Sequence, residues 1–315
     1  MKSRGWWESM ELPEQVTVYE VGPRDGFQNL ARFVPTDSKI AFIDALSAAG
    51  LPAIEATSFV SPQWVPQLAD AHEVMQRIER RASVRYPVLV PNLTGLERAV
   101  ETGVREIAVF TAASETFNRR NINASIAESI ERFRPVAERA QELGLDMRGY
   151  VSTAFGCPYQ GAVEPESVVR VAGQLIELGC GEVSIGDTIG VADPAQVHDV
   201  VGRLKDAFGL QGIALHLHDT YGRGLANVVA GLDAGVRTFD AAAGGLGGCP
   251  YAKGASGNLS TEDLVAMLHH MGIETGVDLH ALVAATSELA ASTGLQMASR
   301  AFEALRSRRR EPIPA

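Results

Sequence analysis

Cysteine is scarce in this chain, and long apolar runs are absent. The three cysteines, Cys157, Cys180 and Cys249, form no CxxC pair and no even set. This pattern argues against a disulfide framework and against a structural zinc site, and it favours a reducing compartment. Because no run of about 18 apolar residues is present, we expect no membrane span. The opening segment, MKSRGWWESMELPEQ, has the features of neither a signal peptide nor a transit peptide, so we expect a cytoplasmic protein.

Positive charge is also in the minority. The chain has 28 Lys and Arg against 38 Asp and Glu, which gives a formal net charge of −10. Binding to a phosphate backbone needs a basic surface, so this charge argues against nucleic acid as the main partner and against adhesion to an anionic membrane. With 46% hydrophobic and 21% charged residues, the composition is typical of a folded globular protein. A chain of 315 residues is long enough to bury a large core.

Short β-rich runs alternate with amphipathic helical stretches along the chain. The predicted strands lie at 16–22, 53–58, 84–90, 105–111, 146–155, 181–187, 213–219 and 236–243. The predicted helices lie at 37–50, 72–81, 94–103, 124–144, 164–179, 194–209, 225–235 and 261–272. This alternation of short apolar strands and helices predicts an α/β fold, a (β/α)8 TIM barrel, whose active site lies at the C-terminal ends of the strands.

A doubly wound sheet is the alternative architecture. It normally has GxGxxG after the first strand, whereas this chain has GPRDGFQN there. We therefore expect an N-terminal extension at 1–15, a catalytic barrel at 16–275, and extra C-terminal helices with a tail at 276–315.

Two histidines on one predicted strand are the strongest sign of chemistry. His216 and His218 are two positions apart, and alternate residues of a strand point to the same side. At the end of a barrel strand both imidazoles enter the mouth, where Asp25 and Asn258 follow other strands. Two imidazoles with carboxylate and amide oxygens suit Mg²⁺ or Mn²⁺, with Zn²⁺ or Fe²⁺ as alternatives. The competing interpretation is a pair of histidines satisfied by neighbouring polar groups.

Charged residues at other strand ends are candidates for catalysis. Arg24 and Asp25, close to Gln28, form either a surface ion pair or, in the barrel mouth, a stabiliser of a developing oxyanion beside a metal ligand. Glu55 is either catalytic or the partner of a buried arginine. Asp187 ends the sixth strand and is predicted to act as a base or to orient a neighbouring group.

Cys249 lies in an unusually glycine-rich segment, GGLGGCPYAKGASGN. Glycine lets a loop turn sharply and approach a ligand closely. The functional interpretation is a thiol general acid on a loop that closes over a substrate. The alternative is a buried apolar cysteine in a mobile lid. The segment is not a P-loop, because Lys253 and Gly254 stand in the reverse of the required order.

These segments resemble the 3-hydroxy-3-methylglutaryl-CoA lyases, which are metal-dependent lyase and synthase barrels. The resemblance covers about residues 16–275, and the cysteine segment is its most specific part. It rests on VGPRDGFQN, IEATSFVSPQWVPQLAD, NINASIAES, SIGDTIGVADP, HLHDTYGRGLAN and GLGGCPYAKGASGNLSTEDLV.

The resemblance implies a retro-Claisen cleavage that yields acetyl-CoA and acetoacetate, with an acyl-CoA substrate, a divalent cation and a homodimer. It implies that the cation is held by four residues, Asp25, His216, His218 and Asn258. It further implies that Arg24 stabilises an enolate, that Cys249 relays a proton, and that His216 combines metal binding with proton transfer. Glu55 and Asp187 complete the implied site, and Gln28 lies near the substrate.

The chain departs from the family pattern after the first predicted strand: Phe27 stands where leucine is usual, beside the expected substrate face, and Leu30 and Ala31 follow Asn29 where an acidic residue is common. The alternatives are the same cleavage of another 3-hydroxy-3-substituted glutaryl-CoA, a related 2-oxoacid Claisen synthase, and a non-catalytic barrel that binds a metal or CoA. The last would be expected to lack one of the implied site residues, and none is missing.

Overall fold

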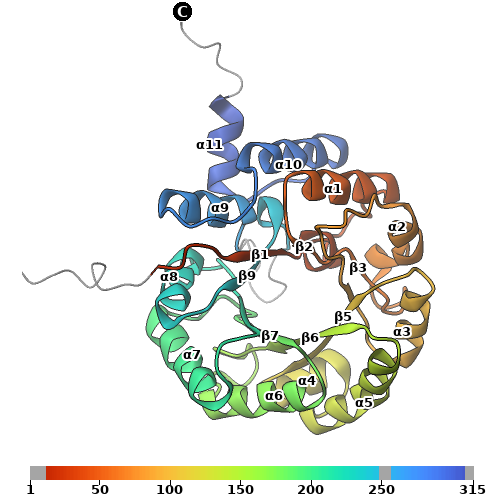
Figure 1. The fold of residues 1–315 in the computed structure, drawn as a ribbon, viewed down its shortest axis with the longest axis vertical. Helices are drawn as coiled ribbons and strands as arrows, with labels where there is room; N and C mark the ends of the chain where they lie inside the picture. Colours follow the sequence, from red (N-terminus) through yellow and green to blue (C-terminus); the bar gives the residue numbers. More distant parts are fainter. Residues whose placement is uncertain (1–11, 248–256, 309–315) are drawn as a thin grey trace, which may run out of the picture.

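Parallel strands form a ring enclosed by helices (Figure 1). The computed structural model describes residues 12–247 and 257–308. The strands are β1 Thr17–Glu20, β2 Ala53–Ile54, β3 Thr57–Ser58, β4 Val88–Leu89, β5 Glu106–Ala112, β6 Asp146–Ser152, β7 Glu182–Gly186, β8 Ile213–His216 and β9 Thr238–Ala241. The helices and helical turns are η2 Gly22–Gly26, α1 Thr36–Ala48, η3 Pro66–Leu68, α2 Ala71–Arg77, α3 Leu93–Val100, α4 Glu115–Ile122, α5 Ile126–Glu142, α6 Pro165–Glu177, α7 Pro194–Phe208, α8 Gly224–Ala234, η4 Ala243–Gly245, α9 Thr261–His270, α10 Leu279–Thr293 and α11 Arg300–Arg308.

The ring closes through one interrupted strand. The sheet order is β2-β1-β9-β8-β7-β6-β5-β4-β3, with parallel pairing throughout. β2 and β3 are the two halves of the strand predicted at 53–58, which breaks at Glu55 and Ala56. The Glu55 N–H donates to the Glu20 carbonyl on one side, and the Ala56 N–H donates to the Pro87 carbonyl on the other. The described residues therefore form the eight-stranded barrel that the sequence predicts.

Local sequence explains where the helices begin. Ser125 and Asp193 each accept a hydrogen bond from a backbone N–H three residues on, and both form a capping box that starts α5 and α7. The strands are buried because helices cover their outer face and side chains fill the barrel, as in parallel sheets generally. These elements bring the C-terminal strand ends together at one mouth.

Two local features differ from the prediction. The strand predicted at 84–90 is regular only at β4, but it also pairs at Arg85, which bridges Ala53, and at Val90, whose N–H donates to the Ala108 carbonyl. Pro87 interrupts it because a proline has no N–H to donate. The helix α4 was not predicted, since its sequence ETFNRRNI is mostly polar and its apolar anchor is Phe117 alone among buried hydrophobic residues. Ser114 caps this helix by accepting from the Phe117 N–H.

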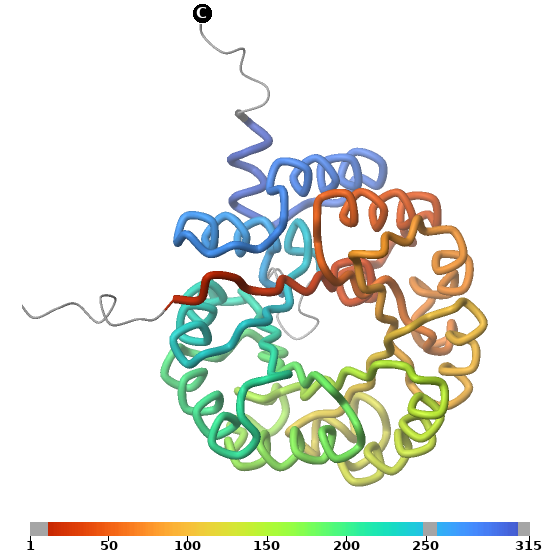
Figure 2. Tube along the Cα trace, in the orientation of Figure 1, coloured from red at the N-terminus to blue at the C-terminus, as the bar shows by residue number. Residues whose placement is uncertain are grey.

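The C-terminal helices pack beside the start of the barrel. α10 lies along α1, and α11 lies against α9 and α10, so the C-terminal helices pack against the first helix of the barrel through α10 (Figure 2). Phe302 of α11 is buried there. In the part of the chain that the structure describes, no helix is both long enough and apolar enough to cross a membrane.

Candidate active site

The turn after β1 places Arg24 and Asp25 in the barrel mouth. The backbone N–H groups of Arg24, Asp25 and Gly26 all donate to the Val21 carbonyl, which produces the single π-helical turn η2. Such turns are frequent at functional sites. A Cβ on Gly26 would lie 2.8 Å from the Leu246 Cβ, so only glycine lets the turn approach the segment after β9 this closely.

The buried carboxylate of Glu20 stabilises this turn. Glu20 accepts hydrogen bonds from the Gly22 and Ala243 N–H groups and from the Thr261 hydroxyl. It therefore joins the turn after β1 to both sides of the segment that carries Asn258. Burial raises the pKa of Glu20 from its ordinary 4.5 to about 7, against the lowering effect of these hydrogen bonds.

Arg24 is not a surface residue. Its side chain is 8% exposed, and its Nε and NH2 groups contact one oxygen of Glu55, Oε2, at 2.8 and 2.7 Å. Its NH1 group donates to Asp25 Oδ1 at 2.6 Å. These three contacts leave part of the five-donor guanidinium for an oxygen in the cavity that Arg24 lines. The surface ion pair considered from the sequence is therefore excluded, and Glu55 is the partner of a buried arginine.

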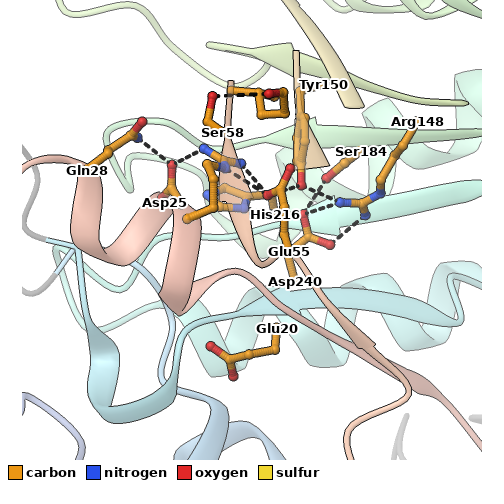
Figure 3. Close-up of polar contacts among 12 residues, drawn as sticks. Glu20, Asp25, Gln28, Glu55, Ser58, Arg148, Tyr150, Ser184, His216 and Asp240 are labelled. Carbon is orange, nitrogen blue, oxygen red and sulfur yellow. Dashed lines mark hydrogen bonds and ion pairs between the residues drawn. The ribbon is translucent and has the colours of Figure 1, made fainter. Parts of the chain in front are cut away.

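The two histidines meet as the strand pattern predicts. His216 at the end of β8 and His218 just beyond it bring their Nε2 atoms to 3.2 Å. Ligand atoms of Asp25, His216 and His218 all lie within 4.8 Å of one another. Asn258 joins them, since its Nδ2 donates to Asp25 Oδ2 at 2.8 Å. Figure 3 shows Asp25 and His216 converging beside Gln28, which donates to Asp25 Oδ1 at 2.7 Å.

The donor set fits a divalent cation. Among the described residues, the Oδ1 atom of Asn258 is buried and has no hydrogen-bond partner. A buried polar atom without a partner is costly, and a cation would satisfy it. Burial and the neighbouring His216 lower the pKa of His218 to about 3, which keeps that imidazole neutral and able to bind a metal. Burial raises the pKa of Asp25, but Arg24, the two histidines and the Asn258 hydrogen bond together outweigh it and lower that pKa overall.

A cavity of about 810 Å³ opens from these groups. It is lined at the mouth by Arg24, Asp25, Gln28, His216 and His218. Across the barrel its wall is apolar and comes from Leu89, Phe110 and Tyr150. Farther out it reaches Trp64 and the cations Arg120 and Arg132. The cavity thus has a polar, cation-binding inner end, an apolar wall and a basic outer end.

A buried network behind the site has no counterpart in the predictions from sequence. Arg148 of β6 donates to both oxygens of Asp240 on β9, at 2.6 and 3.1 Å, and Asp240 lies 3.3 Å from His216 Nδ1. The Ser184 hydroxyl also donates to Asp240. Burial raises the pKa of Asp240, but Arg148 and these hydrogen bonds outweigh it and lower the pKa to about 2. The available signal was a charged residue in the middle of each of two short, mostly buried strands.

Two residues singled out in the sequence, Asp187 and Phe27, lie outside the metal-binding cluster. Asp187 is buried and accepts from the Val191 and Ala192 N–H groups, so it organises the loop after β7, and its catalytic role stays a prediction. Burial raises the pKa of Asp187 to about 6. Phe27 does not lie on the substrate face, because its side chain is buried and packs against Phe42 of α1, with 5.9 Å between the ring centroids. Cys249 lies outside the described residues.

Known proteins match the chain over most of its length. A lyase from Danio rerio named "3-hydroxy-3-methylglutaryl-CoA lyase, cytoplasmic" is 54% identical over 272 residues, 86% of this chain and 81% of that protein. "Hydroxymethylglutaryl-CoA lyase, mitochondrial" from Mus musculus is 53% identical over 274 residues, 87% of this chain and 84% of that protein.

Solved structures agree with these relatives. A hydroxymethylglutaryl-CoA lyase from Pseudomonas aeruginosa has a TM-score of 0.93 and 49% identity, and covers 94% of this chain and 99% of its own. An HMG-CoA lyase from Acinetobacter baumannii, in complex with coenzyme A and 3-methylmalate, has a TM-score of 0.89 and 41% identity, and covers 96% of this chain and 98% of its own. The HMGL-like family model matches residues 15–289, a span that contains every site residue described above. The chain therefore belongs to the HMGL-like family.

Proposed function

We propose that the protein is a divalent-metal-dependent lyase that cleaves 3-hydroxy-3-methylglutaryl-CoA to acetyl-CoA and acetoacetate. The observation that carries this proposal is the position of Arg24 beside the ligand cluster of Asp25, His216 and His218, at the polar end of a large cavity. The names of the relatives and their high identity over most of the chain support the same reaction.

The reaction needs two kinds of stabilisation. The C3 hydroxyl loses its proton, the C2–C3 bond breaks, and the electron pair of that bond forms the enolate of the thioester. Protonation at C2 then gives acetyl-CoA, while C3 becomes the ketone of acetoacetate. A bound Mg²⁺ or Mn²⁺ supplies a Lewis acid that acidifies the hydroxyl and neutralises a carboxylate.

The chain's own residues supply the remaining roles. Asp25, His216, His218 and Asn258 would hold the cation, as their donor atoms and the unpartnered Asn258 Oδ1 indicate. Arg24 faces the thioester oxygen with the N–H groups that Glu55 and Asp25 leave free, and it stabilises the enolate as charge develops.

Proton transfer involves His216 and Cys249. His216 accepts the hydroxyl proton at Nε2, because Asp240 holds the opposite ring nitrogen. The same Nε2 lone pair would otherwise bind the cation, so His216 would act as the base where Asp25, His218 and Asn258 hold the cation. Cys249 delivers the proton to C2.

The cavity suggests how the substrate lies. C3 carries a hydroxyl group, two polar arms and one methyl group. The methyl group faces the apolar wall of Leu89 and Phe110, which lies across the barrel from β8 and β9. The CoA moiety extends to the outer end, toward Arg120 and Arg132, whose charges suit its phosphates.

We propose in addition that the protein is cytoplasmic, since its few unpaired cysteines favour a reducing compartment, and that it forms a homodimer, as the resemblance implies. Its relatives carry both cytoplasmic and mitochondrial names. Cell fractionation tests the compartment, and light scattering on the purified protein tests the dimer.

The reaction is tested with chelator-treated protein and 3-hydroxy-3-methylglutaryl-CoA. We expect no turnover without metal, and equal amounts of acetyl-CoA and acetoacetate once Mg²⁺ or Mn²⁺ is added. Parallel reactions with 3-hydroxyglutaryl-CoA and a 3-ethyl analogue test the substrate.

His218→Ala should abolish the response to metal. His198→Ala is the matched control, because His198 lies on α7 with its side chain 62% exposed. Full activity in the metal-stripped protein would refute the metal-dependent reaction.

A further inference from the structure

Arg148 is a fully buried cation at the centre of the barrel. Its guanidinium lies 3.7 Å from the centre of the Tyr19 ring, and its Nε donates to Glu182 Oε1 at 2.7 Å. The proposed mechanism gives it no role, and it does not line the cavity. A buried arginine needs a reason, because desolvating a guanidinium is costly and well-packed apolar residues often replace buried ion pairs without loss of stability.

One arm of contacts runs from Arg148 to the metal-binding half of the site. The guanidinium donates two hydrogen bonds to the Asp240 carboxylate, at 2.6 and 3.1 Å. Asp240 Oδ2 in turn lies 3.3 Å from His216 Nδ1 (Figure 3). A hydrogen bond to one ring nitrogen sets the tautomer and the orientation of a metal-binding imidazole. Arg148 thereby fixes the carboxylate that aims His216 Nε2 at His218.

A second arm runs from Arg148 to the arginine half of the site. Its NH1 donates to the Tyr150 hydroxyl at 2.7 Å, and that hydroxyl donates to Glu55 Oε2 at 2.9 Å. The same Glu55 oxygen receives Arg24 Nε at 2.8 Å. The Tyr150 hydroxyl keeps its proton for this bond, since burial raises its pKa well above the ordinary value.

We propose that Arg148 is a positioning residue that aligns both halves of the site, His216 through Asp240 and Arg24 through Tyr150 and Glu55. One guanidinium thus contacts both arms, through two N–H groups to Asp240 and one to the Tyr150 hydroxyl. The reach into two directions requires a planar guanidinium and is not reproduced by an ammonium group. The metal arm of this inference rests on the proposed function.

The simpler account is that Arg148 only balances the charges of the buried Asp240 and the partly buried Glu182. The two accounts differ for Arg148→Lys, which keeps the charge and loses the fork. Charge balance alone predicts near-normal behaviour for this variant. Positioning predicts weaker metal binding together with slower turnover.

The experiment measures Mn²⁺ affinity by calorimetry, steady-state kinetics and the melting temperature. For Arg148→Lys we expect Mn²⁺ binding weaker by roughly 10–100-fold, the usual effect of losing a group that supports a metal ligand. We also expect kcat to fall by at least about tenfold at saturating Mn²⁺. Arg85→Lys is the matched control, since Arg85 pairs with Glu106 of β5 outside the cavity. It should leave Mn²⁺ affinity and kcat unchanged.

Two single-arm variants keep the test decisive if Arg148→Lys does not fold. Asp240→Asn should weaken Mn²⁺ binding, whereas Tyr150→Phe should lower kcat and leave Mn²⁺ affinity unchanged. Arg148→Lys with wild-type affinity and kcat would overturn the inference, and so would single-arm variants that affect neither quantity. A wild-type protein that binds no Mn²⁺ would instead overturn the proposed function, and the metal arm with it.

Discussion

Replacing Arg24 separates its role in the reaction from its role in the fold. Arg24→Gln removes the charge that Glu55 pairs with, and both side chains of this pair are nearly inaccessible, at 8% and 0% exposed. Breaking a buried ion pair from one side costs about 3–5 kcal/mol. For 315 residues, with an unfolding entropy of about 2.1 cal/mol/K per residue, that cost lowers the melting temperature by about 5–8 °C.

The effect on the rate should be larger and of a different kind. Removing one oxyanion donor slows a reaction by about 10²–10³, and Arg24→Gln also removes the charge, so we expect kcat to fall by at least about 10³. The loss should appear in kcat more than in KM, because the enolate forms only after the substrate binds. Arg24→Lys keeps the charge but loses the fork that holds Glu55, so it should also be poorly active.

The double variant Arg24→Gln with Glu55→Gln is the decisive control. It removes both members of the ion pair, so most of the lost melting temperature should return, while kcat should stay low. Melting curves and steady-state kinetics on the three proteins give the answer. Recovery of kcat together with stability would show that Arg24 acts only through the fold, and near-normal kcat in a folded Arg24→Gln protein would remove it from the mechanism.

Three further predictions concern other parts of the chain. Cys249→Ser should keep the fold and Mn²⁺ affinity but lose roughly 10²–10⁴ in kcat, the range for a positioned acid–base group, and an unchanged rate in the lyase assay would contradict this. Because folding raises the pKa of Glu20 from 4.5 to about 7, the folded state holds a proton that the unfolded chain releases, so this group's contribution to stability falls as the pH rises between those values. The free energy of unfolding of Glu20→Gln, measured in urea, should therefore match that of the wild type near pH 5 and exceed it by up to about 3 kcal/mol at pH 8. An equal difference between the two proteins at both pH values would contradict this prediction. Phe110→Ala should improve kcat/KM for the 3-ethyl analogue over the 3-methyl substrate by roughly 10-fold or more, whereas an equal change for both substrates would show that Phe110 does not contact the C3 substituent.

The barrel was predictable because its signals are local and repeated. Apolar strand segments, helix caps such as Ser125 and Asp193, and glycines after helices recur along the chain at the spacing of a (β/α)8 barrel. The pairing of His216 with His218 was predictable for the same reason, since strand geometry places alternate side chains on one side.

The network behind the site was not predictable in this way. Arg148 and Asp240 are 92 positions apart and belong to no motif, and their contact depends on how β6 and β9 face each other inside the ring. Glu55 was ambiguous because its partner, Arg24, lies 31 positions away. Phe27 was misplaced because the π-helical turn directs consecutive residues to different sides, which strand periodicity does not describe.

Closure of the ring has a consequence for when the protein becomes active. Asp25 and Asn258 are 233 positions apart and touch at 2.8 Å, and β1 pairs directly with β9. A chain that has not yet been synthesised as far as Asn258 therefore lacks part of the cluster, however well its earlier strands have formed. Because contacts this distant in sequence carry the largest loop-closure cost, recovery of Mn²⁺ binding during refolding reports the late joining of the two ends of the barrel.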